Sequence, residues 1–504
     1  MNIQEAKEQV KYTVSSYLTR DEANRPVLSL ERQRPVFLMG PPGIGKTAIM
    51  QQIADELGIN LVSYSMTHHT RQSALGLPYI TDKVYDGKTV RVSEYTMSEI
   101  ISSMYDEMEE TGRKEGILFL DEINCVSETL APSMLQFLQF KTFGRHRIPD
   151  GWIVVTAGNP PEYNDSVREF DIVTWDRLKR IDVEPDFNAW KEYAYLKGLH
   201  ASIITYLLAR PQDFYLVQTT VDGKSFVTAR GWEDLSNIID LYEENGFPVD
   251  INLVSQYLQN GRIAEEFAIY YSLYNKYKSN YQIEEILAGT AGDEMVARAQ
   301  AARFDERLTV LGLLMDHLGN DFRAIYRMEE ILRILVRELR ENREALSLGT
   351  PEKSLELLDN IHGRLGQLAY GNRTGGIQKD QILFYRGAQK LLETITAGVR
   401  TDTPTSGKAV FEQVRAGFGA ERAALREKVE ETSGKLDHLF TFVENAFGEG
   451  NEMLILVTEL TSNFFASNFI SHYGCDPYFA HNKDLMFYER QKEISEEIED
   501  LGLN

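Results

Sequence analysis

The eight residues from Gly40 to Thr47 match a pattern that binds phosphate. They read Gly-Pro-Pro-Gly-Ile-Gly-Lys-Thr and fit G-x-x-x-x-G-K-[ST]. An apolar run at residues 36–39 precedes them, and residues 47–57 follow with apolar side chains at helical spacing. Glycines keep side chains out of such a loop, so successive N–H groups can face phosphate oxygens at a helix N-terminus. The pattern predicts a nucleoside triphosphate site between a buried strand and a helix.

Residues of this loop have separate predicted roles. Lys46 is expected to reach the β and γ phosphates, and the Thr47 hydroxyl is expected to hold Mg²⁺. The residues expected to surround the phosphates are Gly40, Pro41, Pro42, Gly43, Ile44, Gly45, Lys46, Thr47 and Ala48.

Two carboxylates follow a second apolar run, residues 116–120. A run that is apolar on both faces is typical of a parallel strand covered by helices, and ligands bind at the carboxyl ends of such strands. Behind a phosphate-binding loop, Asp121 is predicted to support Mg²⁺, directly or through water. Glu122 is predicted to orient and polarise the attacking water. Many strands end in acids, so the preceding loop makes this pattern specific.

The elements around these residues alternate between strand and helix. Strands are expected at residues 60–65, at residues 152–157 before Gly158-Asn159-Pro160, and at residues 180–183. Residues 1–20 and 98–110 have helical patterns. This alternation predicts an α/β fold of the P-loop type, with a doubly wound parallel sheet.

The rest of the chain reads mainly as helix. Residues 189–244 are helical apart from a strand-like patch near residues 224–227, and residues 250–504 are almost entirely helical in pattern. Apolar residues from Leu308 to Ile325 recur at alternating intervals of three and four positions, as in packed helices. Gly319-Asn320-Asp321 is a candidate break that would divide this run into two helices. We therefore predict a nucleotide-binding core at 1–188, a helical lid at 189–248 and a mainly helical C-terminal region at 249–504.

Bulk composition limits the classes of partner. The chain of 504 residues has a net charge of −23, which disfavours sequence-independent attraction to DNA or anionic membranes. A local basic patch around Arg145, His146 and Arg147 is an alternative to a solvated hairpin tip there. Two cysteines provide no disulfide framework, and the longest aliphatic run, residues 453–457, is far too short to span a bilayer. We expect a soluble cytoplasmic protein without membrane insertion.

Four segments in order resemble the AAA+ ATPases, and within them the MoxR-type or dynein-related branch. They are Gly-Pro-Pro-Gly-Ile-Gly-Lys-Thr, Ile-Leu-Phe-Leu-Asp-Glu, Val-Val-Thr-Ala-Gly-Asn-Pro and Thr-Ala-Arg-Gly-Trp, and the resemblance covers roughly residues 1–245. It implies that Asn159, in the position called sensor 1, helps to place the attacking water. Two departures stand out: Ala157-Gly158 replaces the usual Thr-Gln before Asn159, and Cys125 stands where the branch usually has arginine.

The resemblance also assigns roles to arginines. Thr174-Trp-Asp-Arg177-Leu resembles the segment that carries the arginine finger, which reaches the γ phosphate of a neighbouring subunit. Arg177 is therefore the first candidate for the finger and Arg180 the second, the alternative being an ordinary surface arginine. Thr228-Ala-Arg230-Gly-Trp resembles sensor 2, which acts in cis, although Ala229 replaces the usual proline. The alternative for Arg230 is a plain helix-start arginine.

Two expected hairpins complete the resemblance. The separation of Lys46 from Asp121 is 75 residues, and residues 75–96 carry a hairpin pattern around Asp86-Gly87. This segment resembles the helix 2 insert of the branch, and a second hairpin near residues 140–151 stands where the branch has an insert before sensor 1. The resemblance implies that both face the axial opening of a ring. The alternative is two surface hairpins without such a role.

The function implied by the resemblance is Mg²⁺-dependent ATP hydrolysis in a ring, expected to be a hexamer, coupled to chaperone-like remodelling of a protein partner. Relatives of this type often act with a von Willebrand A-like domain protein, so such a partner is expected. ATP rather than GTP follows from the resemblance alone. Two alternatives are a nucleic-acid motor of the restriction or replication type and a nucleotide-gated scaffold.

Overall fold

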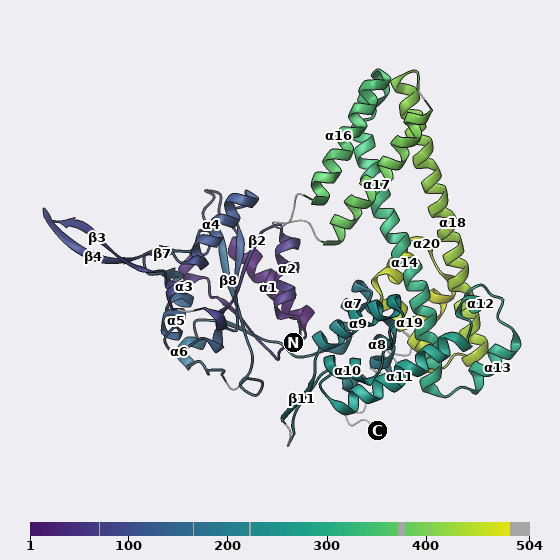
Figure 1. The fold of residues 1–504 in the computed structure, drawn as a ribbon, viewed down its shortest axis with the longest axis horizontal. Helices are drawn as coiled ribbons and strands as arrows, with labels where there is room; N and C mark the ends of the chain where they lie inside the picture. Colours follow the sequence, from purple (N-terminus) through teal and green to yellow (C-terminus); the bar gives the residue numbers. More distant parts are fainter. Residues whose placement is uncertain (70, 165, 221–222, 371–378, 403, 484–504) are drawn as a thin grey trace, which may run out of the picture. The chain divides into compact units, whose positions relative to one another are not determined.

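A computed structural model of the chain describes residues 1–483 apart from residues 70, 165, 221–222, 371–378 and 403 (Figure 1). The chain divides into two compact units. The first contains Met1–Ala189 with the described residues of Leu368–Ile382, and the second contains Trp190–Gln367 with the described residues from Leu383 onward. Each unit is described by itself below.

A parallel sheet forms the centre of the first unit. Among the described residues, five strands pair in the order β2-β5-β8-β1-β9. The strands are β1 (Val36–Met39), β2 (Asn60–Ser65), β5 (Gly116–Asp121), β8 (Trp152–Gly158) and β9 (Lys179–Asp182). Because the central strands β5 and β8 are buried along almost their whole length, apolar side chains are required on both faces. The predicted α/β fold with a parallel sheet is confirmed.

The pairing register fixes where each strand ends. On β1, Met39 lies opposite Gly158 of β8 on one side and opposite Asp182 of β9 on the other. On β5, Leu120 lies opposite Thr156 of β8. Since all these strands run in the same direction, the segments that follow β1, β5 and β8 leave the sheet on the same side.

Short helices surround this sheet. The first of them begins as its sequence predicts, because Asn2 and Glu5 form a capping box at its N-terminus. The helix that follows the long hairpin begins at an N-cap serine, Ser98, and ends before Gly112 in the left-handed conformation. The helices are α1 (Ile3–Leu18), α2 (Lys46–Leu57), α3 (Arg71–Leu75), α4 (Glu99–Thr111), α5 (Ala131–Phe140) and α6 (Ile172–Trp175), with 3₁₀ turns η1 (Leu30–Arg32), η2 (Met66–His68) and η3 (Ile123–Cys125).

Both expected hairpins are present in the first unit. The longer one pairs β3 (Pro78–Tyr85) with β4 (Lys88–Tyr95) and extends away from the sheet, and the shorter pairs β6 (Thr142–Phe143) with β7 (His146–Arg147) (Figure 1). The two are joined by an ion pair between Arg145 and Glu94. Arg147 is ion-paired to Glu31 at 3.2 Å. Both arginines thus contact carboxylates, although Glu94 is shared with Lys83. The basic patch around Arg145 stays an alternative.

A buried lysine lies at the base of the shorter hairpin. Lys141 is 1% exposed, and its Nζ donates a hydrogen bond of 2.6 Å to the carbonyl oxygen of Gln33. Burial, and then the positive charge of Arg147, lower the pKa of Lys141 to about 8. A neutral hydrogen bond to a carbonyl compensates only part of the cost of removing this ammonium group from water.

The second unit is mainly helical, with one small hairpin of β10 (Leu216–Thr220) and β11 (Gly223–Val227) among its described residues. The sequence indicated only the second of these strands. The helices are α7 (Phe187–Lys197), which starts before the boundary, α8 (Ala201–Ala209), α9 (Ala229–Asn245), α10 (Ile251–Tyr257), α11 (Gly261–Asn280), α12 (Ile283–Leu287), α13 (Asp293–Ala301), α14 (Phe304–Glu341), α15 (Arg343–Leu348), α16 (Pro351–Tyr370), α17 (Lys379–Thr401), α18 (Gly407–Phe447), α19 (Asn451–Ser462) and α20 (Phe464–Tyr473), with η4 (Pro211–Asp213). The end of α16 and the start of α17 lie in the part of the chain that belongs to the first unit.

The expected break at Gly319-Asn320-Asp321 is wrong, because α14 runs through it without interruption. Leu318 and Phe322 on either side are buried in the core of the unit. Asp321 accepts hydrogen bonds of 2.9 Å from Lys428 and from Lys435 of α18. Tertiary contacts therefore stabilise the helix across residues that locally favour a turn.

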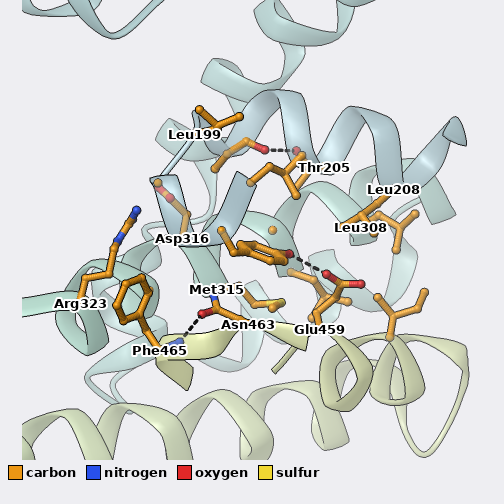
Figure 2. Close-up of a pocket in the computed structure, with 18 residues that line it drawn as sticks. Leu199, Thr205, Leu208, Leu308, Met315, Asp316, Arg323, Glu459, Asn463 and Phe465 are labelled. Carbon is orange, nitrogen blue, oxygen red and sulfur yellow. Dashed lines mark hydrogen bonds between the residues drawn. The ribbon is translucent and has the colours of Figure 1, made fainter. Parts of the chain in front are cut away.

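A small cavity lies inside the second unit (Figure 2). Its volume of about 40 Å³ has room for about three water molecules. Figure 2 shows Asp316 and Arg323 of α14 and Glu459 of α19 beside it. The hydroxyl of Tyr195 donates a hydrogen bond of 2.6 Å to Glu459. Its lining includes none of the predicted site residues that the structure describes.

The described residues contain no single helix that is long and apolar enough to cross a membrane. Helices α19 and α20 pass the length and composition test only together, and the chain bends by 89° between them. Their apolar side chains belong to the largely buried core that they share with α14 and α18.

Replacing either of two glycines of α14 by alanine should change the stability of the protein, in opposite directions for the two sites. A Cβ on Gly319 would meet no atom within 4 Å, whereas a Cβ on Gly312 would lie 1.8 Å from Cγ2 of Thr205. Gly319→Ala should therefore stabilise the protein by about 0.5–1 kcal/mol, because alanine lowers the entropy of the unfolded chain. Gly312→Ala should destabilise it by about 1–3 kcal/mol. Urea denaturation of the full chain measures both changes in the unfolding free energy. A destabilising effect of Gly319→Ala would show that the space beside Gly319 does not accept a methyl group.

Lys141 should make stability depend on alkaline pH. The folded chain releases this proton near pH 8 and the unfolded chain near 10.5, so the unfolding free energy should rise through that window. Between pH 7 and pH 9.5, the unfolding free energy of the wild type should rise by about 2 kcal/mol more than that of Lys141→Met. Urea denaturation at the two pH values measures this gain. Lys88→Met, at the exposed tip of the long hairpin, is the control, and an equal gain against both variants would refute the assignment to Lys141.

Candidate functional site

The loop between β1 and α2 has the backbone that the sequence pattern predicts. Gly43 and Gly45 have φ values of 75° and 96°, which favour glycine. A Cβ on Gly40 would lie 2.7 Å from the carbonyl oxygen of Val183, so the close approach of the loop to β9 requires glycine there too. The first bond within α2 runs from Ile49 N to Gly45 O. The N–H groups at the start of this helix therefore have no acceptor within it.

The side chain of Lys46 lies inside this loop. It is 7% exposed, and its Nζ donates hydrogen bonds of 2.7 Å to the carbonyl oxygens of Gly40 and Pro41. The same atom lies 3.0 Å from Oδ1 of Asn159, which follows β8. The structure thus brings together two predicted site residues that are 113 positions apart.

Thr47 and Asp121 form the pair expected to hold Mg²⁺. The Thr47 hydroxyl donates a hydrogen bond of 2.8 Å to Oδ2 of Asp121. A hydroxyl oxygen and a carboxylate oxygen are the hard ligands that this ion prefers. Thr47 and Ala48 are both exposed in the first turn of α2. The hydroxyl of Thr47, which faces Asp121, is therefore accessible from solvent.

Glu122 has an unusual backbone for a residue with a side chain. Its φ of 56° and ψ of 35° lie in the left-handed region, which costs of order 1 kcal/mol outside glycine. Its carboxylate accepts hydrogen bonds from Ser65 Oγ at 3.0 Å and from Thr67 Oγ1 at 3.1 Å. The sequence analysis missed both hydroxyls. The signal available was the polar end of β2, since Ser65 lies opposite Asp121 in the sheet.

Asn124, in the turn after Glu122, belongs to the segment Asp121-Glu-Ile-Asn124 that resembles the branch, but the sequence pattern assigns it no role. It is 2% exposed, and its Nδ2 donates a hydrogen bond of 2.8 Å to the carbonyl oxygen of Asn159. The next residue, Cys125, replaces the arginine that is usual in the branch. Its thiol accepts from Nδ2 of Asn164 at 3.4 Å, and burial, followed by the charges of Glu122 and Asp121, raises its pKa. A neutral thiol cannot supply the charge of an arginine.

Two candidate finger arginines differ in their surroundings. Arg180 is ion-paired to Asp182 at 2.7 Å and lies over the ring of Trp175 at 4.8 Å. Arg180 also lines an open cleft of about 780 Å³, which borders Gly40 of the phosphate-binding loop in the same chain. Arg177 is exposed and donates a hydrogen bond of 2.6 Å to the neutral amide of Gln139. Of the two, the charge of Arg177 is less compensated by its hydrogen-bond partner.

Arg230 belongs to the second unit. It is exposed in the first turn of α9, whose N-cap is Thr228. Its predicted contact with a nucleotide on the first unit stays a prediction.

One comparison with known proteins gives a result that fits this geometry. Residues 35–178 match the family model described as AAA domain (dynein-related subfamily). The match supports an AAA+ ATPase. No curated protein matches the chain. The AAA domain contains β1, β5 and β8 and every predicted site residue except Arg180 and Arg230.

The AAA domain residues fit a nucleotide and its magnesium ion. The glycine-lined loop at a helix N-terminus suits phosphate oxygens, and the Thr47–Asp121 pair suits Mg²⁺. When bound, the magnesium ion offsets negative charge on the phosphates. Lys46 supplies a further positive charge, and Asn159 places an amide near that charge. Glu122 supplies a carboxylate that can orient water.

Loss of the Thr47 hydroxyl should weaken magnesium binding. Thr47→Val keeps the shape of the side chain but removes one oxygen ligand, so the Mg²⁺ concentration that half-saturates ATP binding should rise about tenfold. Titration of Mg²⁺ against a fluorescent ATP analogue measures this value. Thr67→Val removes a neighbouring hydroxyl that contacts Glu122 instead, and it should leave the midpoint unchanged. An unchanged midpoint for Thr47→Val would exclude Thr47 as a ligand.

Proposed function

We propose that this chain is an AAA+ ATPase of the MoxR type, active as a ring, expected to be a hexamer, in the cytoplasm. Its ATP cycle would drive chaperone-like remodelling of a protein partner, and a von Willebrand A-like domain protein is the partner we expect. The observation that carries the proposal is the meeting of Lys46, Asn159, Thr47 and Asp121 at one side of the sheet.

Ring assembly is proposed because a neighbouring subunit can supply a positive charge that the reaction needs. A phosphoryl-transfer transition state places charge on the γ oxygens, which a guanidinium group can stabilise. Arg177 is the exposed arginine of the first unit that we assign to this task in the neighbouring subunit, because its hydrogen-bond partner, Gln139, is neutral. A lone subunit would then hydrolyse ATP slowly, and assembly would switch the activity on.

A nucleic-acid motor is the alternative class. It would need a basic surface, but the chain carries a net charge of −23, and Arg145 and Arg147 pair with Glu94 and Glu31. Such a motor would show DNA-stimulated hydrolysis with steep salt dependence. A nucleotide-gated scaffold would bind ATP without turnover, so a measured rate of hydrolysis separates it from the proposal.

Two substitutions test the nucleotide site. Lys46→Ala should abolish ATP binding, because the phosphates lose their buried positive charge. Glu122→Gln should still bind ATP, hydrolyse it about 10²–10⁴-fold more slowly and accumulate as an ATP-bound oligomer. Equilibrium binding, steady-state hydrolysis and light scattering measure these properties. Lys114→Ala, exposed before β5, is the lysine control and should behave as the wild type.

The same measurements test whether Arg177 acts on the nucleotide of a neighbouring subunit. Arg177→Ala should bind ATP but lose about 10³-fold in kcat. Mixing it with Lys46→Ala should restore part of the activity, because each mixed interface can combine an intact nucleotide site with an intact arginine. If Lys46→Ala and Glu122→Gln both hydrolyse ATP like the wild type, the site assignment is wrong. If mixing restores nothing, Arg177 does not act in trans.

A further inference from the structure

The loops that carry Glu122 and Asn159 are joined by one buried side chain, that of Asn124. It lies in the middle of η3, two residues after Glu122, and its amide contacts the segment that follows β8. Asn124 is 2% exposed, and it forms part of the wall of the open cleft that borders Gly40 and Pro41. Its Nδ2 contacts the backbone at Asn159, and its Oδ1 lies 3.9 Å from Sγ of Cys125.

The side chain and backbone of Asn124 also contact neighbouring segments of the chain. Its Nδ2 donates to the carbonyl oxygen of Asn159 at 2.8 Å, and its own carbonyl accepts from the N–H of Arg168 at 2.9 Å. Its Oδ1 occupies the space beside Gly158, where an added Cβ would lie only 2.4 Å away. The absence of a side chain at Gly158 is what lets Asn124 reach this position.

The contact restricts the direction in which Asn159 points. Pro160 follows it and confines Asn159 to extended backbone conformations. With its carbonyl held by Asn124, the remaining freedom of Asn159 is its side chain, whose Oδ1 meets Lys46 Nζ at 3.0 Å. A buried carbonyl that lost this donor would cost about 1–3 kcal/mol, so the strand end would shift to find another partner.

The contact also supports the strained turn of Glu122. The N–H of Cys125 donates to the carbonyl of Glu122 at 2.9 Å and closes η3 around Asn124. Anchoring Asn124 to β8 thus offsets part of the cost of the left-handed backbone at Glu122. One carboxamide fixes the predicted water-orienting carboxylate and the predicted sensor relative to each other.

We propose that Asn124 is a positioning residue for ATP hydrolysis, whose buried carboxamide sets the separation of Glu122 and Asn159. This rests on the proposed ATPase function. Ground-state binding of ATP depends mainly on the phosphate-binding loop, whereas the chemical step depends on the alignment of both groups. The role of Asn124 is therefore confined to turnover.

The test compares Asn124→Asp and Asn124→Ala with Thr156→Val in the full chain. Asn124→Asp keeps the shape but replaces the donor by an acceptor. Thr156→Val is the matched control, because Thr156 is equally buried in β8 and its hydroxyl donates to the Val36 carbonyl at 3.0 Å. It removes a buried hydrogen bond from the same sheet without touching either loop.

Both Asn124 variants should lose about 10–100-fold in kcat and in kcat/KM, with ATP affinity within about threefold of the wild type. Thr156→Val should keep kcat within about twofold while its thermal stability falls by a similar amount to that of Asn124→Ala. If the Asn124 variants turn over at the wild-type rate, or lose rate no more than Thr156→Val, the inference is overturned and the proposed function stands. If the wild type itself fails to bind and hydrolyse ATP, the proposed function fails, and this inference fails with it.

Discussion

Parallel pairing of β8 between β5 and β1 is the constraint on which the candidate site depends. These strands are buried on both faces and pair in a fixed register, so the three segments that follow them emerge side by side. Lys46 therefore meets Asn159, and Thr47 meets Asp121, although each pair is far apart in the chain. A slip of one residue in any of these strands would turn its side chains to the other face and separate the groups.

The sheet also supports backbone conformations that the loops would not adopt alone. Gly43 and Gly45 take left-handed conformations at little cost, but Glu122 does so with a full side chain. Hydrogen bonds from Ser65 and Thr67 hold its carboxylate, and Asn124 holds the turn that follows. The cost of the conformation is thus offset by contacts with the ends of the neighbouring strands β2 and β8 and the segments that follow them.

In the second unit, a buried charge pair joins two segments that are distant in sequence. Lys191 of α7 forms an ion pair of 2.5 Å with Glu459 of α19, which also accepts a hydrogen bond from Tyr195. Both charged residues are almost fully buried, so removing one partner would leave an uncompensated charge. Helix α7, which directly follows the AAA-like core, is therefore tied to a helix near the end of the described chain.

The sequence by itself determined the strands of the sheet, the phosphate-binding loop, the acids after β5 and both hairpins, because these depend on local patterns of apolar residues, glycines and turn signals. It did not reveal Asn124, Ser65 or Thr67 as partners of the site, since hydrogen bonds across strands leave no spacing signal in one chain. It also failed at Gly319, where local turn preference was overridden by ion pairs from α18. Tertiary structure alone decided these points, because each depends on which distant segment packs against the residue.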